Sequence, residues 1–155
     1  MFWKYQPSSL VFALASVAWI LVISSFSTSS FGANKTASYI EVYLREIFPT
    51  FQISTIHLIH IAIRKLGHFV EFGIFAALVF GIFAARKATW KINWLIFSTI
   101  IVVIIAFLDE YHQSFVRNRS ASLQDSLVDI LGGLAALLIF WIIKKSKFNK
   151  QDSKI

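Results

Sequence analysis

The sequence predicts an all-α integral membrane protein, a bundle of four transmembrane helices plus a short amphipathic outer helix. Hydrophobic residues make up 57% of its 155 residues, and the mean hydropathy is +0.68, which is too apolar for an ordinary soluble domain of this size. Four apolar runs each approach the roughly 20 residues that a tilted membrane helix needs. These runs cover residues 10–26, 66–85, 92–108 and 126–143. We expect one membrane domain over 1–155.

The first run carries a topology question of its own. It could be a cleaved signal peptide, but no clear A-x-A-like site follows it, so we expect an uncleaved anchor. Basic residues gather before this run, after the second run and in the tail, 144–155. By the positive-inside rule, both termini and this tail are then cytoplasmic. The basic residues concerned are Lys4, Arg86, Lys87, Lys91, Lys144, Lys145, Lys147, Lys150 and Lys154.

The segments between the first two runs are expected to lie outside the membrane or at its surface. Residues 27–38 are rich in Ser and Thr and read as an external loop. Apolar residues at helical spacing over 40–48 predict the short amphipathic helix, ending near Pro49. Residues 50–64 are apolar but interrupted by polar ones, so we expect them in the outer interface. His57 and His60 there lack a carboxylate partner, which favours interfacial packing over a metal site.

Ionisable residues mark one level of the bundle. Lys65, His68 and Glu71 share a face of the second run, and Asp125 and Asp129 share a face of the last. The third run ends at Asp109 and Glu110, and the chain from 109 to 125 is expected to be the connecting loop. Charges inside lipid are costly and mark a functional site by default. We therefore predict an outer-leaflet polar site formed by Lys65, His68, Glu71, Asp109, Glu110, His112, Gln113, Arg119, Asp125 and Asp129.

Small residues are expected to bring two of the helices close together. Gly73 and Gly81 form a stripe on the second run, and Gly132 and Gly133 lie on the fourth. Such stripes let helix backbones approach each other in lipid. Because Gly132 and Gly133 follow the acidic pair closely, this packing would fix the carboxylates in place.

Two elements of the sequence resemble a known family. Residues 64–72, RKLGHFVEF, are similar to an R-K-x-x-H-F-x-E-Y element, and residues 109–119, DEYHQSFVRNR, to a D-E-x-H-Q-x-F-V-P-G-R element that continues through Ser122, Asp125 and Asp129. Both belong to the VanZ-like family of small bacterial membrane proteins, named for a protein linked to resistance to the glycopeptide teicoplanin. The resemblance is strongest over 64–133. Phe72 replaces the usual Tyr, and Arg117-Asn118 replaces Pro-Gly, so a looser turn is expected.

The resemblance and the polar site together leave three functions open. The site could bind or process a cell-envelope or glycopeptide-related ligand. It could belong to a hydrolase or transferase acting on a lipid-linked phosphate headgroup, with Arg119 and Lys65 holding the phosphate, His68 or His112 as base or nucleophile, and Glu71 or Asp109 orienting the imidazole. It could also serve a small ion- or proton-coupled carrier, although four unbroken spans are poor evidence for transport.

The partners and cofactors expected are few. The lipid bilayer is the main partner, and the oligomeric state stays open. We attribute the net charge of +7 to the orientation of the chain in the membrane, so no nucleic-acid partner is expected. The absence of cysteine excludes disulfides, thiolate metal sites and thiol catalysis. A metal site of Asp109, His112, His68 and Glu71 is chemically adequate, but no fixed ligand spacing supports it, so neither a metal nor another cofactor is predicted.

Overall fold

The structure is a computed structural model that describes residues 8–85, 91–117, 119 and 121–152, with the side chains of all of these except 33–34 and 144–152. The described residues form helices and no strand: α1 (Ser9–Phe26), η1 (Ser29–Phe31), α2 (Ala33–Ile47), α3 (Ile53–Ala84), α4 (Ile92–Ser114) and α5 (Leu123–Asp152). Four of them, namely α1, α3, α4 and α5 over Leu123–Ile143, are long and apolar enough to cross a membrane. The predicted all-α membrane fold is confirmed.

Part of the expected topology signal falls outside these residues. Lys4, Arg86, Lys87 and Lys154 are not among the described residues, and neither is Asn118 of the expected looser turn. The backbone of the basic tail is described as far as Asp152 and continues α5. The orientation inferred from the charges of the tail therefore rests on the sequence alone.

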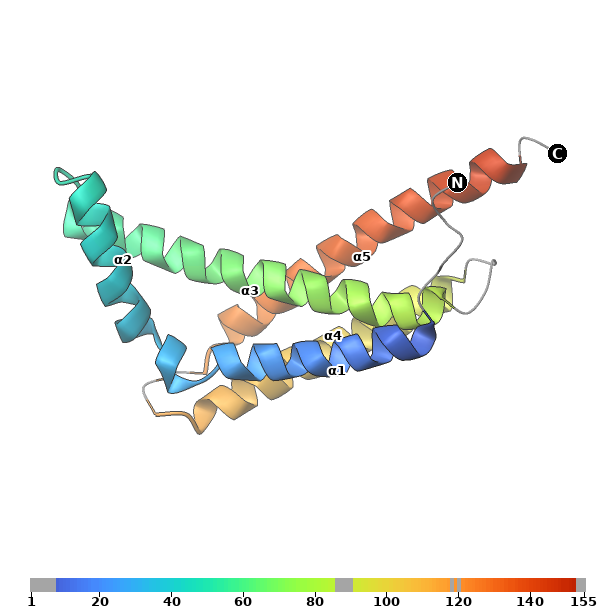
Figure 1. The fold of residues 1–155 in the computed structure, drawn as a ribbon, viewed down its shortest axis with the longest axis horizontal. Helices are drawn as coiled ribbons and strands as arrows, with labels where there is room; N and C mark the ends of the chain where they lie inside the picture. Colours follow the sequence, from blue (N-terminus) through green and yellow to red (C-terminus); the bar gives the residue numbers. More distant parts are fainter. Residues whose placement is uncertain (1–7, 86–90, 118, 120, 153–155) are drawn as a thin grey trace.

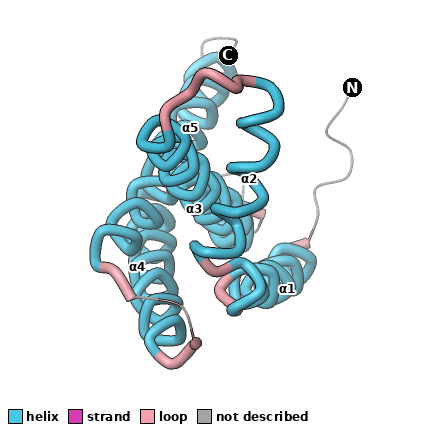
Figure 2. Tube along the Cα trace, turned by 90° about the vertical axis from the view of Figure 1, so that its left-hand side faces the viewer, coloured by secondary structure: helices cyan, strands magenta, loops and turns pink. Residues whose placement is uncertain are grey.

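The helices alternate in direction (Figure 1). α1 and α4 run one way, α3 and α5 run the other way, and α2 links the end of α1 to the beginning of α3. α3 packs against α1, α2, α4 and α5, and the end-on view in Figure 2 shows it among them. The end of α1, the end of α4 and the beginning of α5 consequently lie on the same side of the bundle.

The region between the first two spans differs from the expectation. The expected loop over 27–38 is correct only as far as residue 32, where it contains the short η1, because α2 begins at Ala33. The expected interfacial segment over 50–64 is wrong as a separate piece, since Ile53 begins the single 32-residue helix α3. No Pro or Gly interrupts residues 53–64. The polar residue His60 is buried and its Nε2 lies 2.9 Å from Thr36 Oγ1 of α2, so α2 covers a polar position that suggested an interface.

The third span is longer than expected for a related reason. Residues 109–114, expected in a loop, form the last turns of α4, which ends at Ser114. Gln113 Nε2 donates to Asp109 Oδ2 at 2.6 Å, one turn away along the same helix. These polar side chains therefore pair with each other inside a continuous helix. The connection to α5 is short, and the Ser122 carbonyl accepts from the backbone N–H groups of Asp125 and Ser126 to begin that helix.

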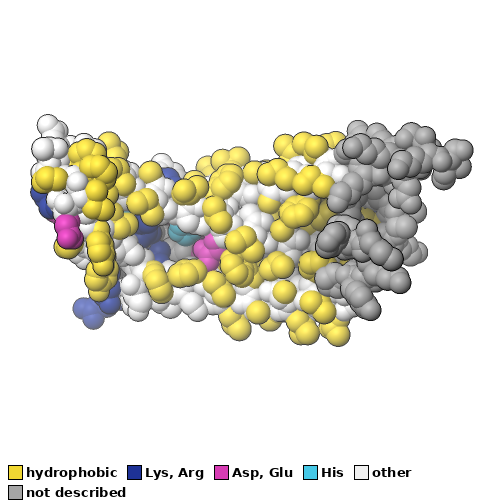
Figure 3. Space-filling model, turned by 45° about the horizontal axis from the view of Figure 1, so that its top comes forward, with side chains coloured by type: hydrophobic (Ala, Val, Ile, Leu, Met, Phe, Trp, Pro, Cys, Tyr) yellow, Lys and Arg dark blue, Asp and Glu magenta, His cyan; other side chains and the backbone are white. Residues whose placement is uncertain are grey.

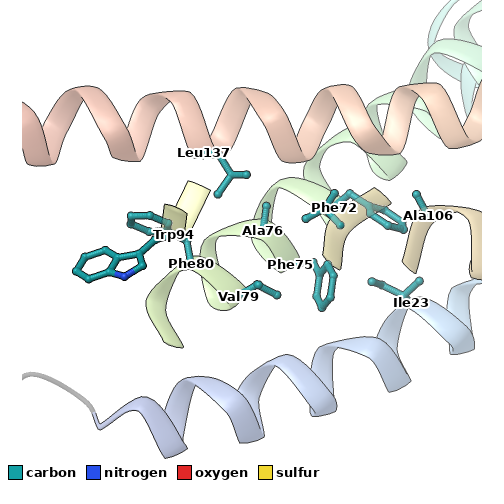
Figure 4. Close-up of a cluster of buried hydrophobic side chains, with 10 residues drawn as sticks. Ile23, Phe72, Phe75, Ala76, Val79, Phe80, Trp94, Ala106 and Leu137 are labelled. Carbon is teal, nitrogen blue, oxygen red and sulfur yellow. The ribbon is translucent and has the colours of Figure 1, made fainter. Parts of the chain in front are cut away.

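A hydrophobic core fixes α3 among its neighbours (Figure 4). Phe72 and Phe75 of α3 are almost fully buried, and Ile23 of α1 packs on the same cluster. The remaining members are Ala76, Val79, Phe80, Trp94, Val102, Ala106 and Leu137. Since Phe72 directly follows Glu71, the core begins where the polar residues of α3 end. Its packing therefore sets the height and rotation of the polar face.

A close seam joins α3 to α5. A Cβ on Gly132 would lie on the carbonyl oxygen of Phe69, and a Cβ on Gly73 would be 3.8 Å from Ala136 Cβ. The contacts advance in the same direction along both helices, so the two helices run parallel along the seam. The facing pairs are Lys65 with Asp125, His68 with Asp129, Phe69 with Gly132, and Gly73 with Ala136. One register thus places two polar pairs and two small-residue contacts.

The other two glycines of the stripes meet different helices. A Cβ on Gly133 would lie 2.6 Å from Val102 Cγ1 of α4, and one on Gly81 would meet the Phe12 ring of α1. Gly132 and Gly133 therefore let α5 approach α3 and α4 at adjacent positions. Close approach of this kind is the use that membrane helices make of small residues.

Candidate functional site

The most accessible part of the polar cluster is an ion pair between α3 and α5. Lys65 Nζ lies 3.5 Å from Asp125 Oδ1, and the two side chains are 40% and 24% exposed. Figure 3 shows histidine, acidic and basic side chains close together on one face, surrounded by hydrophobic ones. The Lys65–Asp125 pair is therefore a part of the cluster that a ligand from outside the bundle can reach.

A second pair lies one turn deeper along the same seam. His68 Nδ1 is 3.1 Å from Asp129 Oδ1, and the Asp129 side chain is 0% exposed. Asp129 Oδ2 is buried and has no hydrogen-bond partner among the described residues. Glu71, the next polar residue down α3, likewise buries its Oε1 without a partner there. Two carboxylate oxygens at the bottom of the cluster are therefore free to accept.

Asp109 is held by a small hydrogen-bond network. Its Oδ1 accepts from Ser27 Oγ at 2.5 Å, and its Oδ2 accepts from Gln113 Nε2 at 2.6 Å. Gln113 Nε2 also donates to Ser27 Oγ at 3.2 Å. All three residues are buried. The network fixes the orientation of the Asp109 carboxylate and joins the end of α1 to α4.

Glu110 ties the loop before α5 to the end of α4. The backbone N–H of Ser122 donates to Glu110 Oε2 at 2.5 Å. The other oxygen, Oε1, is buried without a partner among the described residues. The contact positions Ser122, whose carbonyl begins α5, so Glu110 helps to set the place of Asp125 one turn later.

Arg119 is bonded to α1 and not to the acids. Its guanidinium donates to the backbone carbonyls of Phe26 and Thr28 at the end of α1, where a positive charge is favourable. Burial, and then the charge of Arg64, lower the pKa of Arg119, while Asp109 and other acids oppose that shift. Its hydrogen bonds therefore indicate that Arg119 joins the chain before α5 to the end of α1, and not that it holds a phosphate as expected.

His112 is the predicted site residue that the structure leaves outside. Its side chain is exposed, whereas Asp109, Glu110 and Gln113 on the same helix are buried. The structure therefore brings together Lys65, His68, Glu71, Asp109, Glu110, Gln113, Asp125 and Asp129, with Arg119 at the edge. The first eight come from α3, α4 and α5, and Arg119 lies between α4 and α5.

The comparison with protein families decides the relationship of the chain. The VanZ/LLP1 family model matches residues 10–144, which is most of the chain and includes every residue of the cluster. The chain belongs to the VanZ/LLP1 family. The resemblance carried by residues 64–133 is confirmed. No curated protein and no solved structure matches it.

Sequence reasoning missed two contacts of this VanZ/LLP1 protein, and both come from α1 or its end. Ser27 donates to Asp109 across 82 positions of the chain, and Trp19 Nε1 donates to the backbone carbonyl of Glu71 at 3.0 Å. Ser27 stands in a run of Ser and Thr with nothing in its spacing to set it apart. Only the three-dimensional approach of α1 to α3 and α4 identifies these two residues.

The cluster of this VanZ/LLP1 protein has the donor atoms for cation or headgroup binding. Carboxylates outnumber the basic groups at its bottom, and His68 is the imidazole among them. One ligand atom each from His68, Asp109 and Asp129 lies within 4.8 Å of the others. The arrangement can bind a cation, accept hydrogen bonds from an amine or hydroxyl, or exchange a proton between an imidazole and a carboxylate.

Proposed function

We propose that this chain is a cell-envelope protein of the bacterial cytoplasmic membrane that binds or processes the polar headgroup of an envelope precursor or a glycopeptide-related ligand. The observation that carries the proposal is the gradient of exposure along the α3–α5 seam, from the partly exposed Lys65–Asp125 pair to the fully buried Asp129. The other faces of these helices expose large apolar side chains, as lipid-facing helices do. An amphiphile in the bilayer could therefore present its headgroup to the seam.

The polar side chains favour a ligand with hydrogen-bond donors or a positive group. Asp125, Asp129 and Glu71 offer carboxylate oxygens in a region where a charge needs a partner. Lys65 adds one cation at the entrance and so accommodates a zwitterionic headgroup. The family relationship supports a ligand of the glycopeptide response, because the VanZ-like family takes its name from that response.

Orientation is part of the same proposal. The positive-inside rule places both termini in the cytoplasm. The end of α1, the end of α4 and the beginning of α5 then face outward, since they lie at the other end of the bundle (Figure 1). The polar cluster, which is next to them, would be reached from the outer leaflet.

Single cysteines should report this orientation without background, because the natural chain has none. A membrane-impermeant maleimide added to intact cells is expected to label Arg117→Cys, which is exposed just after α4. Lys91→Cys, exposed just before α4, is expected to react only after the membrane is permeabilised. Labelling of Lys91→Cys in intact cells with protection of Arg117→Cys would reverse the orientation and remove the outward-facing site.

The ligand class is tested in a teicoplanin-susceptible bacterium that expresses the chain. We expect the wild-type chain to raise the inhibitory concentration of teicoplanin several-fold and to alter the binding of fluorescent teicoplanin to the cells. Asp125→Ala should remove both effects, because it takes away the acidic side of the entrance pair. His112→Ala is the control, since that side chain is exposed away from the cluster.

Two results would contradict the proposal. One is an unchanged response to teicoplanin when the wild-type chain is present in the membrane. The other is a full response from Asp125→Ala at equal protein level, which would separate the effect from the cluster.

A further inference from the structure

We infer that His68, Asp109 and Asp129 form a divalent-cation site, and that Zn²⁺ is the ion whose chemistry fits it best. One ligand atom of each side chain lies within 4.8 Å of the other two. The three residues come from α3, α4 and α5, so the site exists only in the packed bundle. It does not depend on which ligand the proposed function assigns to the cluster.

A buried carboxylate oxygen without a hydrogen-bond partner points independently to a cation site. The Asp129 side chain is 0% exposed, and its Oδ2 has no hydrogen-bond partner among the described residues. A buried carboxylate oxygen left without a partner is costly, and more so inside a membrane bundle. His68 occupies Oδ1 of the same carboxylate, so Oδ2 remains available to an ion.

Glu71 adds a buried acidic group next to these three residues. Its Oε1 is buried and has no partner among the described residues. Its charge interacts with His68, Asp109 and Asp129, although its oxygens are not among the ligand atoms that lie within 4.8 Å of one another. Three carboxylates around one imidazole carry excess negative charge, and a divalent cation would balance it.

The mixture of donor atoms favours Zn²⁺. Imidazole nitrogen with carboxylate oxygen suits zinc, whereas Mg²⁺ and Ca²⁺ prefer oxygen ligands throughout. Zinc bonds of about 2.0 to 2.2 Å in a tetrahedron put ligand atoms roughly 3.5 Å apart. The ligand atoms of His68, Asp109 and Asp129, now within 4.8 Å, would close by about an ångström through small side-chain rotations.

The surroundings hold one ligand in place. Ser27 Oγ and Gln113 Nε2 each donate to an oxygen of Asp109, leaving further lone pairs for an ion. Hydrogen bonds of this kind orient metal ligands in proteins. Ser27 and Gln113 are therefore positioning residues of the ion site.

Calorimetric titration of the purified full chain with Zn²⁺, after treatment with a chelator, tests the site. We expect saturable binding of one Zn²⁺ per chain and no saturable binding of Mg²⁺ at the same concentrations. His68→Gln and Asp129→Asn should each weaken Zn²⁺ binding at least tenfold. His112→Ala and His57→Ala, which remove exposed imidazoles on α4 and α3, should leave it unchanged.

A second measurement on the wild-type chain keeps the test valid if a site variant fails to fold. Co²⁺ should give visible absorption bands of a low-coordinate nitrogen and oxygen site, and added Zn²⁺ should remove them. The inference is overturned if the wild-type chain binds neither ion saturably, if both folded site variants bind Zn²⁺ like the wild type, or if only the His112→Ala or His57→Ala change abolishes binding. A wild-type chain that binds Zn²⁺ but leaves the teicoplanin response of the cells unchanged would count against the proposed function alone.

Discussion

Gly132→Ala is expected to lower the free energy of unfolding by roughly 1–3 kcal/mol or more, which is the usual cost of overpacking a close contact. The added Cβ would lie on the Phe69 carbonyl oxygen and 2.8 Å from its carbonyl carbon. These are backbone atoms and cannot rotate aside, so α3 and α5 must move apart. The movement would also stretch the His68–Asp129 contact one turn away.

Gly67→Ala is the matched control on the facing helix. Nothing lies within 4 Å of the Cβ it would add, so the change should be neutral or stabilising by up to about 1 kcal/mol through helix propensity. Unfolding of both variants in mixed micelles, followed by helical circular dichroism, measures the difference. If the two variants unfolded at the same denaturant fraction, the tight α3–α5 seam would be wrong.

Asp109→Ala should have the next largest effect on stability, about 1–3 kcal/mol, because it leaves buried donors without their acceptor. Ser27 Oγ and Gln113 Nε2 both donate to this carboxylate, and Gln113 is 1% exposed. The same change should remove any function of the cluster. Unfolding in mixed micelles and the teicoplanin response provide the two readouts.

A double-mutant cycle with Ser27→Ala separates the contact from general damage. Ser27→Ala alone should cost less than Asp109→Ala, since Gln113 still donates to the carboxylate. The two changes together should cost clearly less than their sum, because they remove a shared hydrogen bond. Strict additivity would show that Ser27 and Asp109 do not interact, and that Ser27 does not join the end of α1 to the site.

The spans could be predicted from the sequence because lipid demands long apolar runs, and the beginning of α1 at Ser9 and of α4 at Ile92 lie within one residue of the expected bounds. The extension of α3 back to Ile53 could not. The polar residues of 53–64 indicate an interface by composition, but His60 is buried against Thr36 of α2. Composition alone does not distinguish a polar side chain that meets water from one that meets another helix.

The candidate site, too, could be predicted only in part from the sequence. Helix periodicity places Lys65 and His68 on one face and Asp125 and Asp129 on another, and the structure sets these faces against each other. Periodicity cannot say which partner a loop residue takes. Arg119, predicted to hold a phosphate, donates instead to the carbonyls of Phe26 and Thr28 at the end of α1. Ser27 could not be identified from the sequence, because its role depends on a contact with Asp109, which is far along the chain.

The candidate site depends on the register of α3 against α5, and an engineered disulfide tests that register most directly. Cβ atoms at positions 73 and 136 would be 3.8 Å apart, the mean separation in disulfides of about 3.8 Å. In native membranes treated with a permeant oxidant, Gly73→Cys with Ala136→Cys should lose both thiols to an intramolecular bond. Gly73→Cys with Leu138→Cys, whose side chain is exposed on another face of α5, should keep them. Efficient cross-linking of the second pair and not the first would contradict the register, and with it the convergence of Lys65 and His68 on Asp125 and Asp129.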